Sequence, residues 1–269
     1  MQPLKAIKKR ARLVQQKLDQ RLNLRGEFVS RATRPGDIFL VSYPKSGNTW
    51  VRFLLANLLW QDQLTVDFRS INALVPPVTV LHRHGQLPPP RLVKSHAPFQ
   101  PTYPRTIYLL RDGRDTMVSY YHYELKRGTL PPETTLGDYL RRTDHWPCPW
   151  ATHVASWLDA GLPAGQLLLL RYETMKQDPA GVLQQMLDFI GLTATPAQIA
   201  QAVDNASFDA MRRLEAQSGG PRSMAHSGFI RRGQAGGWRD ELGTAERDIL
   251  KPQMNDMLIR LGYASDGAW

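Results

Sequence analysis

Four short apolar runs occur along the chain, and turn-forming or polar residues bound each of them. Brief runs rich in Ile, Val and Leu, with no polar face, are typical of strands that are buried on both faces of a parallel sheet. The pattern predicts strands at Ile38 to Ser42, Leu92 to Ser95, Thr106 to Leu110 and Leu167 to Arg171.

Helical patterns lie between and after these runs, with apolar residues at spacings of three and four. The predicted helices are Thr49 to Trp60, Asp115 to Lys126, Ala151 to Ala160, Ala180 to Ile190 and Thr244 to Leu261. Strands that alternate with helices favour a three-layer α/β fold, with a central, mostly parallel sheet flanked by helices. Ligands bind at the carboxyl ends of the strands in such sheets.

The net charge of +10 is concentrated at the start of the chain. Residues 1–35 hold ten Lys or Arg and two acidic residues, so they carry +8 and leave +2 for the rest. This distribution argues against a nucleic-acid-binding domain. The apolar spacing from Leu4 to Leu18 predicts a basic amphipathic helix, which either packs on the protein itself or contacts an anionic membrane or acidic partner through residues 1–25. We therefore expect an N-terminal extension, followed by a domain over residues 36–269.

Cysteine content and hydropathy bear on the compartment. Cys148 is the only cysteine, which excludes an intramolecular disulfide and fits a reducing environment. The longest apolar stretch, around Phe53 to Trp60, is too short to cross a bilayer, and the first thirty residues lack the continuous apolar region of a secretory signal. We expect a globular protein of the cytoplasm.

The stretch YPKSGNTW, residues 43–50, joins the first predicted strand to a helix. Backbone N–H groups and the helix dipole make such a turn a natural site for a phosphate. The loop that binds nucleoside triphosphates reads G-x-x-x-x-G-K-[ST], with its lysine after the last glycine. Here Lys45 precedes Gly47, so the loop is expected to bind a different anion, and a P-loop nucleotide kinase is the weaker alternative.

Two further basic segments are suited to anion binding. In RDGRDTMVS, Arg111 ends a strand and Ser119 lies on the next helix. Ser119 comes back over the start of that helix if the chain turns sharply at Asp112-Gly113, which a glycine permits, and the two residues would then hold a second phosphate. In FIRRGQAGGWR, Arg231 and Arg232 precede three glycines, a combination that favours a clamp over an anion.

These segments, in this order, resemble those of the cytosolic-type sulfotransferases, which use 3′-phosphoadenosine 5′-phosphosulfate (PAPS). YPKSGNTW resembles their 5′-phosphosulfate loop, RDGRDTMVSYYHY their 3′-phosphate segment, RLVKSHAP their K-T-H segment and FIRRGQAGGWR their R-K-G-x-x-G-x-W-K clamp. The resemblance implies a sulfotransferase fold of the P-loop NTPase-like type. It also implies transfer of a sulfuryl group from PAPS, with 3′-phosphoadenosine 5′-phosphate (PAP) as product and no metal.

The resemblance further implies the site residues. Its catalytic residues are His96, Lys45, Lys94 and Ser119, with His96 as the general base for the acceptor's proton. Lys45 would lie at the bridging oxygen and Lys94 at the sulfonate oxygens. The implied cofactor-binding residues are Lys45, Ser46, Gly47, Asn48, Thr49 and Trp50, then Arg111, Ser119, Tyr172, Phe229, Arg231, Arg232 and Gly233. Of these, Trp50, Tyr172 and Phe229 are assigned to the adenine, and either this role or simple core packing explains them.

The other histidines carry weaker signals. His82 and His84 have the spacing of metal ligands, but no third ligand is evident, so we expect no metal. His122 is expected to pack in the core or to border the acceptor pocket.

The acceptor is less defined by the sequence. The Tyr, Trp, Phe and Pro content of residues 61–90, 121–149 and 218–227 favours a small phenol, alcohol or amine. The last of these stretches is also expected to be a mobile lid. RDELGTAERD, after Trp238, lacks the K-x-x-x-T-V-x-x-x-E pattern of dimers in the animal enzymes, so the oligomeric state is open. A non-catalytic nucleotide-binding protein is the alternative from another functional class.

Overall fold

The computed structural model describes residues 30, 32–60, 63–221 and 228–269. The basic helix predicted near the N-terminus therefore lies outside the described residues. The same is true of most of the predicted lid.

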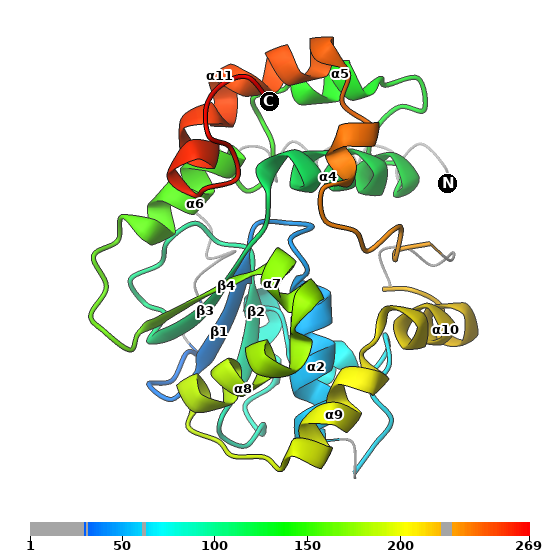
Figure 1. Cartoon of the computed structure of the whole chain (residues 1–269). Helices are drawn as coiled ribbons and strands as arrows, with labels where there is room; N and C mark the ends of the chain where they lie inside the picture. The colour runs from blue at the N-terminus through cyan, green and yellow to red at the C-terminus, as the bar shows by residue number, and fades with distance from the viewer. Residues whose placement is uncertain (1–29, 31, 61–62, 222–227) are drawn as a thin grey trace, which may run out of the picture.

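A four-stranded parallel sheet forms the centre of the fold (Figure 1). Its strands lie in the order β2-β1-β3-β4, so all their carboxyl ends meet at one edge. Leu40 on β1 pairs with Lys94 on β2 and with Ile107 on β3. The four predicted strands are confirmed as β1 (Ile38–Ser42), β2 (Leu92–Ser95), β3 (Arg105–Leu110) and β4 (Leu167–Arg171).

Helices surround this sheet. The five predicted ones are confirmed, with ends that differ by at most two residues: α2 (Asn48–Trp60), α4 (Gly113–Lys126), α6 (Trp150–Leu158), α8 (Pro179–Ile190) and α11 (Thr244–Arg260). Five others were not predicted: α3 (Ile71–Leu74), α5 (Leu136–Leu140), α7 (Tyr172–Gln177), α9 (Pro196–Asn205) and α10 (Phe208–Ser218). The described residues also form the 3₁₀ helices η1 (Val78–Arg83) and η2 (Gly237–Asp240). Within the described ranges, none of the helices has the length and apolar character that spanning a membrane requires.

The core has two halves because alternate strand residues point to opposite faces of the sheet. Ile38 and Leu40 pack in the half that includes α2, α8 and α9. Phe39 and Val41 pack in the half that includes α4, α6 and α11. Each fully buried side chain of this kind contributes about 1.5–3 kcal/mol to folding. The arrangement confirms the three-layer α/β fold and holds the loops at the carboxyl edge of the sheet in place.

Candidate active site

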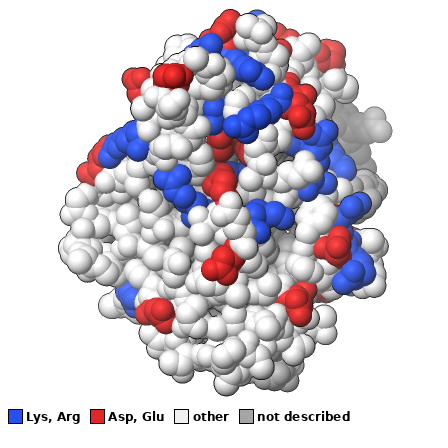
Figure 2. Space-filling model, viewed as in Figure 1, with Lys and Arg blue, Asp and Glu red and all other residues white. Residues whose placement is uncertain are grey.

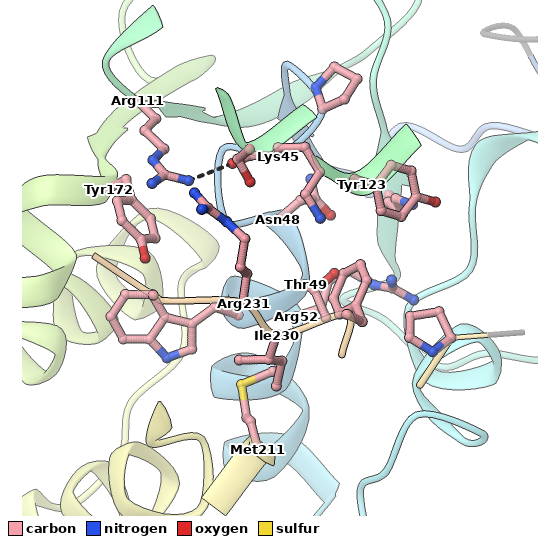
Figure 3. Close-up of a pocket in the computed structure, with 18 of the residues that line it drawn as sticks. Lys45, Asn48, Thr49, Arg52, Arg111, Tyr123, Tyr172, Met211, Ile230 and Arg231 are labelled. Atoms are coloured by element: carbon pink, nitrogen blue, oxygen red, sulfur yellow. Dashed lines mark hydrogen bonds between the residues drawn. The ribbon is translucent and has the colours of Figure 1, made fainter. Parts of the chain in front are cut away.

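A cavity of about 540 Å³ opens at the carboxyl edge of the sheet. It lies between the β1–α2 loop, the second half of α4 and a clamp segment, which we define as residues 228–239. Figure 3 shows that Lys45, Arg111 and Arg231 converge here from three distant parts of the chain. Thirteen of the residues implied by the resemblance line this cavity: Lys45, Gly47, Asn48, Thr49, Trp50, Lys94, His96, Arg111, Ser119, Tyr172, Phe229, Arg231 and Gly233.

The β1–α2 loop forms a cradle that only a glycine fits at its centre. Gly47 has a φ of +98°, and a Cβ there would lie 2.7 Å from the Tyr172 ring. The first turn of α2 follows at once, and Trp50 and Val51 donate their N–H groups to the Gly47 carbonyl oxygen. The N–H groups of Asn48 and Thr49 are therefore the ones left to bind an anion. Ser46 does not line the cavity, but its buried hydroxyl has no hydrogen-bond partner among the described residues. These features suit a bound phosphate.

Lys45 lies half-buried beneath two aromatic rings. Its Nζ lies 4.3 Å from the ring centroids of both Tyr123 and Phe229. Burial, followed by the charge of Arg111, lowers the pKa of Lys45 to about 7. An anion bound beside this amine would favour its protonated form and raise that pKa.

Arg111 links the segments that surround the cavity. Its Nη1 donates to the Lys45 carbonyl oxygen at 2.9 Å (Figure 3), and its Nη2 donates to the Gln234 carbonyl oxygen at 2.8 Å. Its guanidinium lies 4.4 Å from the Tyr172 ring centroid. The buried Nε has no partner among the described residues, so it keeps a hydrogen bond to offer.

The turn into α4 differs from the sequence prediction. Gly113 was expected to permit a sharp turn, but it is the first helical residue and its φ is not positive. The turn is instead made at Asp112, whose side chain accepts the Arg114 N–H as the helix cap. A glycine is needed at 113 for another reason, because a Cβ there would lie 2.8 Å from the Trp150 ring.

Two buried carboxylates hold the clamp segment. Asp115 on α4 accepts the N–H groups of Gly236 at 2.6 Å and Trp238 at 2.9 Å. Glu215 on α10 accepts the three successive N–H groups of residues 228–230. The clamp is therefore anchored at both ends, at one end to α10, which precedes it closely in sequence, and at the other to α4, which lies more than a hundred positions away.

Of the two adjacent arginines Arg231 and Arg232, only Arg231 lines the cavity. Arg231 does so while also pairing with Glu241 at 2.5 Å. Arg232 is outside the cavity wall, contrary to the expectation, because its half-exposed side chain pairs with Glu241 at 3.0 Å. His122 also pairs with Glu241 and does not border the cavity. In the part of the face shown in Figure 2 where basic side chains gather, acidic ones lie among them.

His96 is oriented by the end of β1. Its Nδ1 lies 2.7 Å from the Ser42 carbonyl oxygen, so Nδ1 carries the proton and donates it there. Nε2 is left as an acceptor, and it bonds to none of the described residues. Burial, followed by the charge of Lys94, holds the pKa of His96 well below its usual value. The imidazole is therefore neutral at neutral pH and able to accept a proton.

Several residues of the cavity wall were not identified from the sequence, among them Arg52, Asn72, Tyr123 and Lys176. Arg52 gave a signal that sequence reasoning passed over, since it is the only charged residue in the apolar helix NTWVRFLLANLLW. Asn72 and Lys176 lie on short helices that the pattern did not reveal. Across the described ranges, no three His, Cys, Asp or Glu side chains gather as metal ligands do, and His82 and His84 have no third partner.

Known proteins resemble this chain over most of its length. Rat (Rattus norvegicus) sulfotransferase 1C2 is 27% identical, covering 80% of each chain. Dog (Canis lupus familiaris) sulfotransferase 1B1 is 29% identical, covering 85% of this chain and 86% of the relative.

Solved structures show the same fold. Mouse sulfotransferase SULT7A1, crystallised with PAP, superposes with a TM-score of 0.68 at 23% identity, covering 86% of this chain and 90% of that one. Retinol dehydratase in complex with retinol and PAP gives a TM-score of 0.66 at 21% identity, covering 84% of this chain and 82% of that one.

A family model decides the assignment. The model of the sulfotransferase domain matches residues 35–258, which is most of the chain. The chain therefore belongs to the sulfotransferase family, and it is a PAPS-dependent sulfotransferase.

Proposed function

We propose that this enzyme transfers the sulfuryl group to a hydroxyl or amine of a small organic acceptor, with His96 as the general base. The observation that carries the proposal is the free Nε2 of His96 in the same cavity as Lys45 and Lys94. One structural neighbour binds retinol and another complex of that enzyme binds androsterone, both small molecules with apolar bodies.

The residues of the cavity fit PAPS as the group donor. The β1–α2 loop would hold its 5′-phosphate through backbone N–H groups and the orphaned Ser46 hydroxyl. Arg111, Ser119 and Arg231 would hold its 3′-phosphate, with Gly233 permitting close approach of the clamp. The adenine would lie against Trp50, Tyr172 and Phe229. Arg232 would contribute only long-range charge, because it lies outside the cavity wall.

When bound, PAPS supplies an activated sulfuryl group joined to a phosphate that leaves as PAP. His96 Nε2 would accept the proton of the acceptor as the new bond to sulfur forms. The hydrogen bond from Nδ1 to Ser42 fixes the imidazole in the required tautomer. Lys45 would neutralise charge on the departing phosphate, and Lys94 would neutralise the sulfonate oxygens.

The acceptor would lie next to His96, against aromatic side chains. Trp146 is edge-on to the His96 ring with 5.9 Å between centroids, and Tyr123 and Phe68 also line the cavity. Such walls favour an acceptor with an apolar body and one reactive group.

Replacement of the base tests this assignment. His96→Ala is expected to lower the rate of sulfuryl transfer by roughly 100-fold or more, because proton removal then falls to water. Its PAP affinity, measured by calorimetry, should match that of the wild type. His82→Ala, at an exposed histidine of η1, is the matched control and should transfer normally. Full activity in His96→Ala would eliminate the general-base role.

The nucleotide kinase and the non-catalytic binding protein make different predictions. The kinase should be stabilised most by ATP with magnesium in a thermal-shift assay, whereas the sulfotransferase should be stabilised most by PAP. A non-catalytic protein should keep its biological activity in His96→Ala. The register of Lys45 and Gly47 supports the sulfotransferase in this comparison.

Two proposals from the sequence concern regions beyond this site. We propose a cytoplasmic location, and one relative from Danio rerio carries the name cytosolic sulfotransferase 1. We also propose that residues 1–35 form an extension separate from the catalytic domain, with a basic helix that contacts either the protein itself or an anionic surface. Sedimentation of the full chain with anionic and neutral vesicles separates these two contacts.

A further inference from the structure

Arg52 is a buried cation that the proposed reaction leaves without a role. It lies on α2, one turn beyond the cradle, and its side chain is 3% exposed. Its neighbours in the helix, Val51 and Phe53, are apolar and buried. Burial of a guanidinium costs several kcal/mol unless hydrogen bonds and an opposite charge offset it.

The hydrogen bonds of Arg52 use only one of its three nitrogens. Nη2 donates to the carbonyl oxygens of Ile71 at 3.0 Å and Val75 at 2.8 Å, and to Oδ1 of Asn72 at 2.7 Å. All three acceptors are uncharged. Nε is buried without a partner, and Nη1 makes no hydrogen bond to the described residues. The side chain therefore ties α3 to α2, and it still has donors to spare and an unbalanced charge.

Lys94 presents a second unbalanced charge to the same cavity. Its amine makes neither a hydrogen bond nor an ion pair with the described residues. Burial, followed by the charge of Arg52, lowers the pKa of Lys94 to about 7. Both cations also act on His96, whose pKa they help to lower. Arg52 and Lys94 also lie near each other, because Arg52 Nη2 donates to the Val75 carbonyl oxygen and the Lys94 N–H donates to the carbonyl oxygen of the next residue, Pro76, at 2.9 Å.

Arg52 lies away from the part of the cavity assigned to the 3′-phosphate. Figure 3 shows it on the Tyr123 side of the cavity, apart from Arg111 and Tyr172. The anionic groups of PAPS already have Lys45, Arg111 and Arg231 as proposed partners, and the sulfonate has Lys94. The charge of Arg52 is therefore left for a different ligand.

We propose that Arg52, with Asn72, forms an anion subsite for the acceptor, so that the acceptor carries a carboxylate, phosphate or sulfate group as well as the hydroxyl or amine that is sulfated. This inference rests on the proposed function and names the substrate class of the same site. Phe68, Ile71 and Pro77 line the cavity nearby, so an apolar body would join the two polar ends of such an acceptor.

Matched acceptor analogues test the subsite. The full-length protein is saturated with PAP and titrated with four para-substituted phenols that share one propyl linker and end in a neutral amide, a carboxylate, a phosphate or a sulfate. At least one anionic phenol is expected to bind about ten-fold or more tightly than the amide, because hydrogen bonds to a charged partner are roughly twice as strong as neutral ones. The three anionic arms identify which group the subsite prefers.

Two variants separate the charge of Arg52 from its structural role. Arg52→Gln keeps a donor for the carbonyl oxygens of α3 but removes the charge, and it should reduce the anion preference to about one. Arg52→Lys keeps the charge and should retain part of the preference. Arg127→Gln removes an exposed cation that also lines the cavity, and as the matched control it should leave the preference unchanged.

The outcomes separate this inference from the proposed function. PAP affinity is measured in every variant and shows whether the cofactor cavity is intact. If the wild-type protein does not bind PAP, the proposed function itself is overturned. With PAP bound, equal binding of the amide and all anionic phenols would overturn the subsite. The same conclusion follows if no anionic phenol binds or if the preference survives in Arg52→Gln.

Discussion

Binding of PAP is expected to draw a proton onto Lys45. In the free protein the pKa of this amine is about 7, because burial and then the charge of Arg111 disfavour the ammonium form. A phosphate beside the amine reverses this balance and raises the pKa of Lys45 in the complex. The sign of the effect is therefore proton uptake on binding, and affinity should decrease as the pH rises.

The magnitude follows from the pKa of the free protein. If Lys45 is fully protonated in the complex, uptake is about 0.5 proton at pH 7 and about 0.9 at pH 8. Integrated between these values, Lys45 weakens PAP binding about five-fold from pH 7 to pH 8. The phosphates of PAP also titrate near pH 6, so the contribution of the lysine must be isolated by a variant.

Calorimetry in two buffers of different ionisation enthalpy measures this uptake. At each pH, the difference in observed enthalpy between the buffers gives the number of protons exchanged. Lys45→Met should take up about 0.5 proton less than the wild type at pH 7. Lys251→Met, on the surface of α11, is the matched control and should behave like the wild type. Identical uptake in the wild type and in Lys45→Met would refute the reasoning.

Two further predictions concern the cradle and the clamp. Gly47→Ala should destabilise the fold by about 1–3 kcal/mol, seen as a lower Tm, because the new Cβ meets the Tyr172 ring at a positive φ. Gly165→Ala, at a φ of +83° with open space around it, should cost less. An equal cost would show that the contact with Tyr172 is not the cause. Glu241→Gln should strengthen PAP binding several-fold, because Glu241 competes with the 3′-phosphate for Arg231. If titration calorimetry shows weaker PAP binding in Glu241→Gln, the prediction is wrong, and Glu241 instead supports the bound conformation of the clamp.

Much of the fold could be predicted because burial on both faces of the sheet leaves a simple pattern. The apolar runs of β1 and β2 matched the observed bounds, and the strand order placed the functional loops at one edge. Helix α9 was missed because its start depends on a local capping box at Thr195, not on a long apolar stripe. Helix α10 carries several charges and buries only Met211 and Glu215, so its periodicity is weak.

The site also has features that could be predicted from local sequence and features that could not. The strand-turn-helix layout around Gly47 follows from local sequence and could be predicted, whereas the contact of Gly47 with the Tyr172 ring could not. The support of the clamp by Asp115 depends on contacts to residues more than a hundred positions away, which no local pattern encodes. Arg232 was expected in the cavity wall for a different reason: its partner Glu241 is only nine positions away, but the pairing could not be recognised from charge alone.

The central claim is tested most directly by following sulfur-labelled PAPS with the purified protein and a panel of phenols, alcohols, amines and sugars. Label should pass to at least one small hydroxyl or amine acceptor in step with release of PAP, and His96→Ala should abolish most of the transfer. Failure of the protein to bind PAP would contradict the account. So would a result in which the label stays on PAPS with every acceptor while the protein hydrolyses ATP with magnesium.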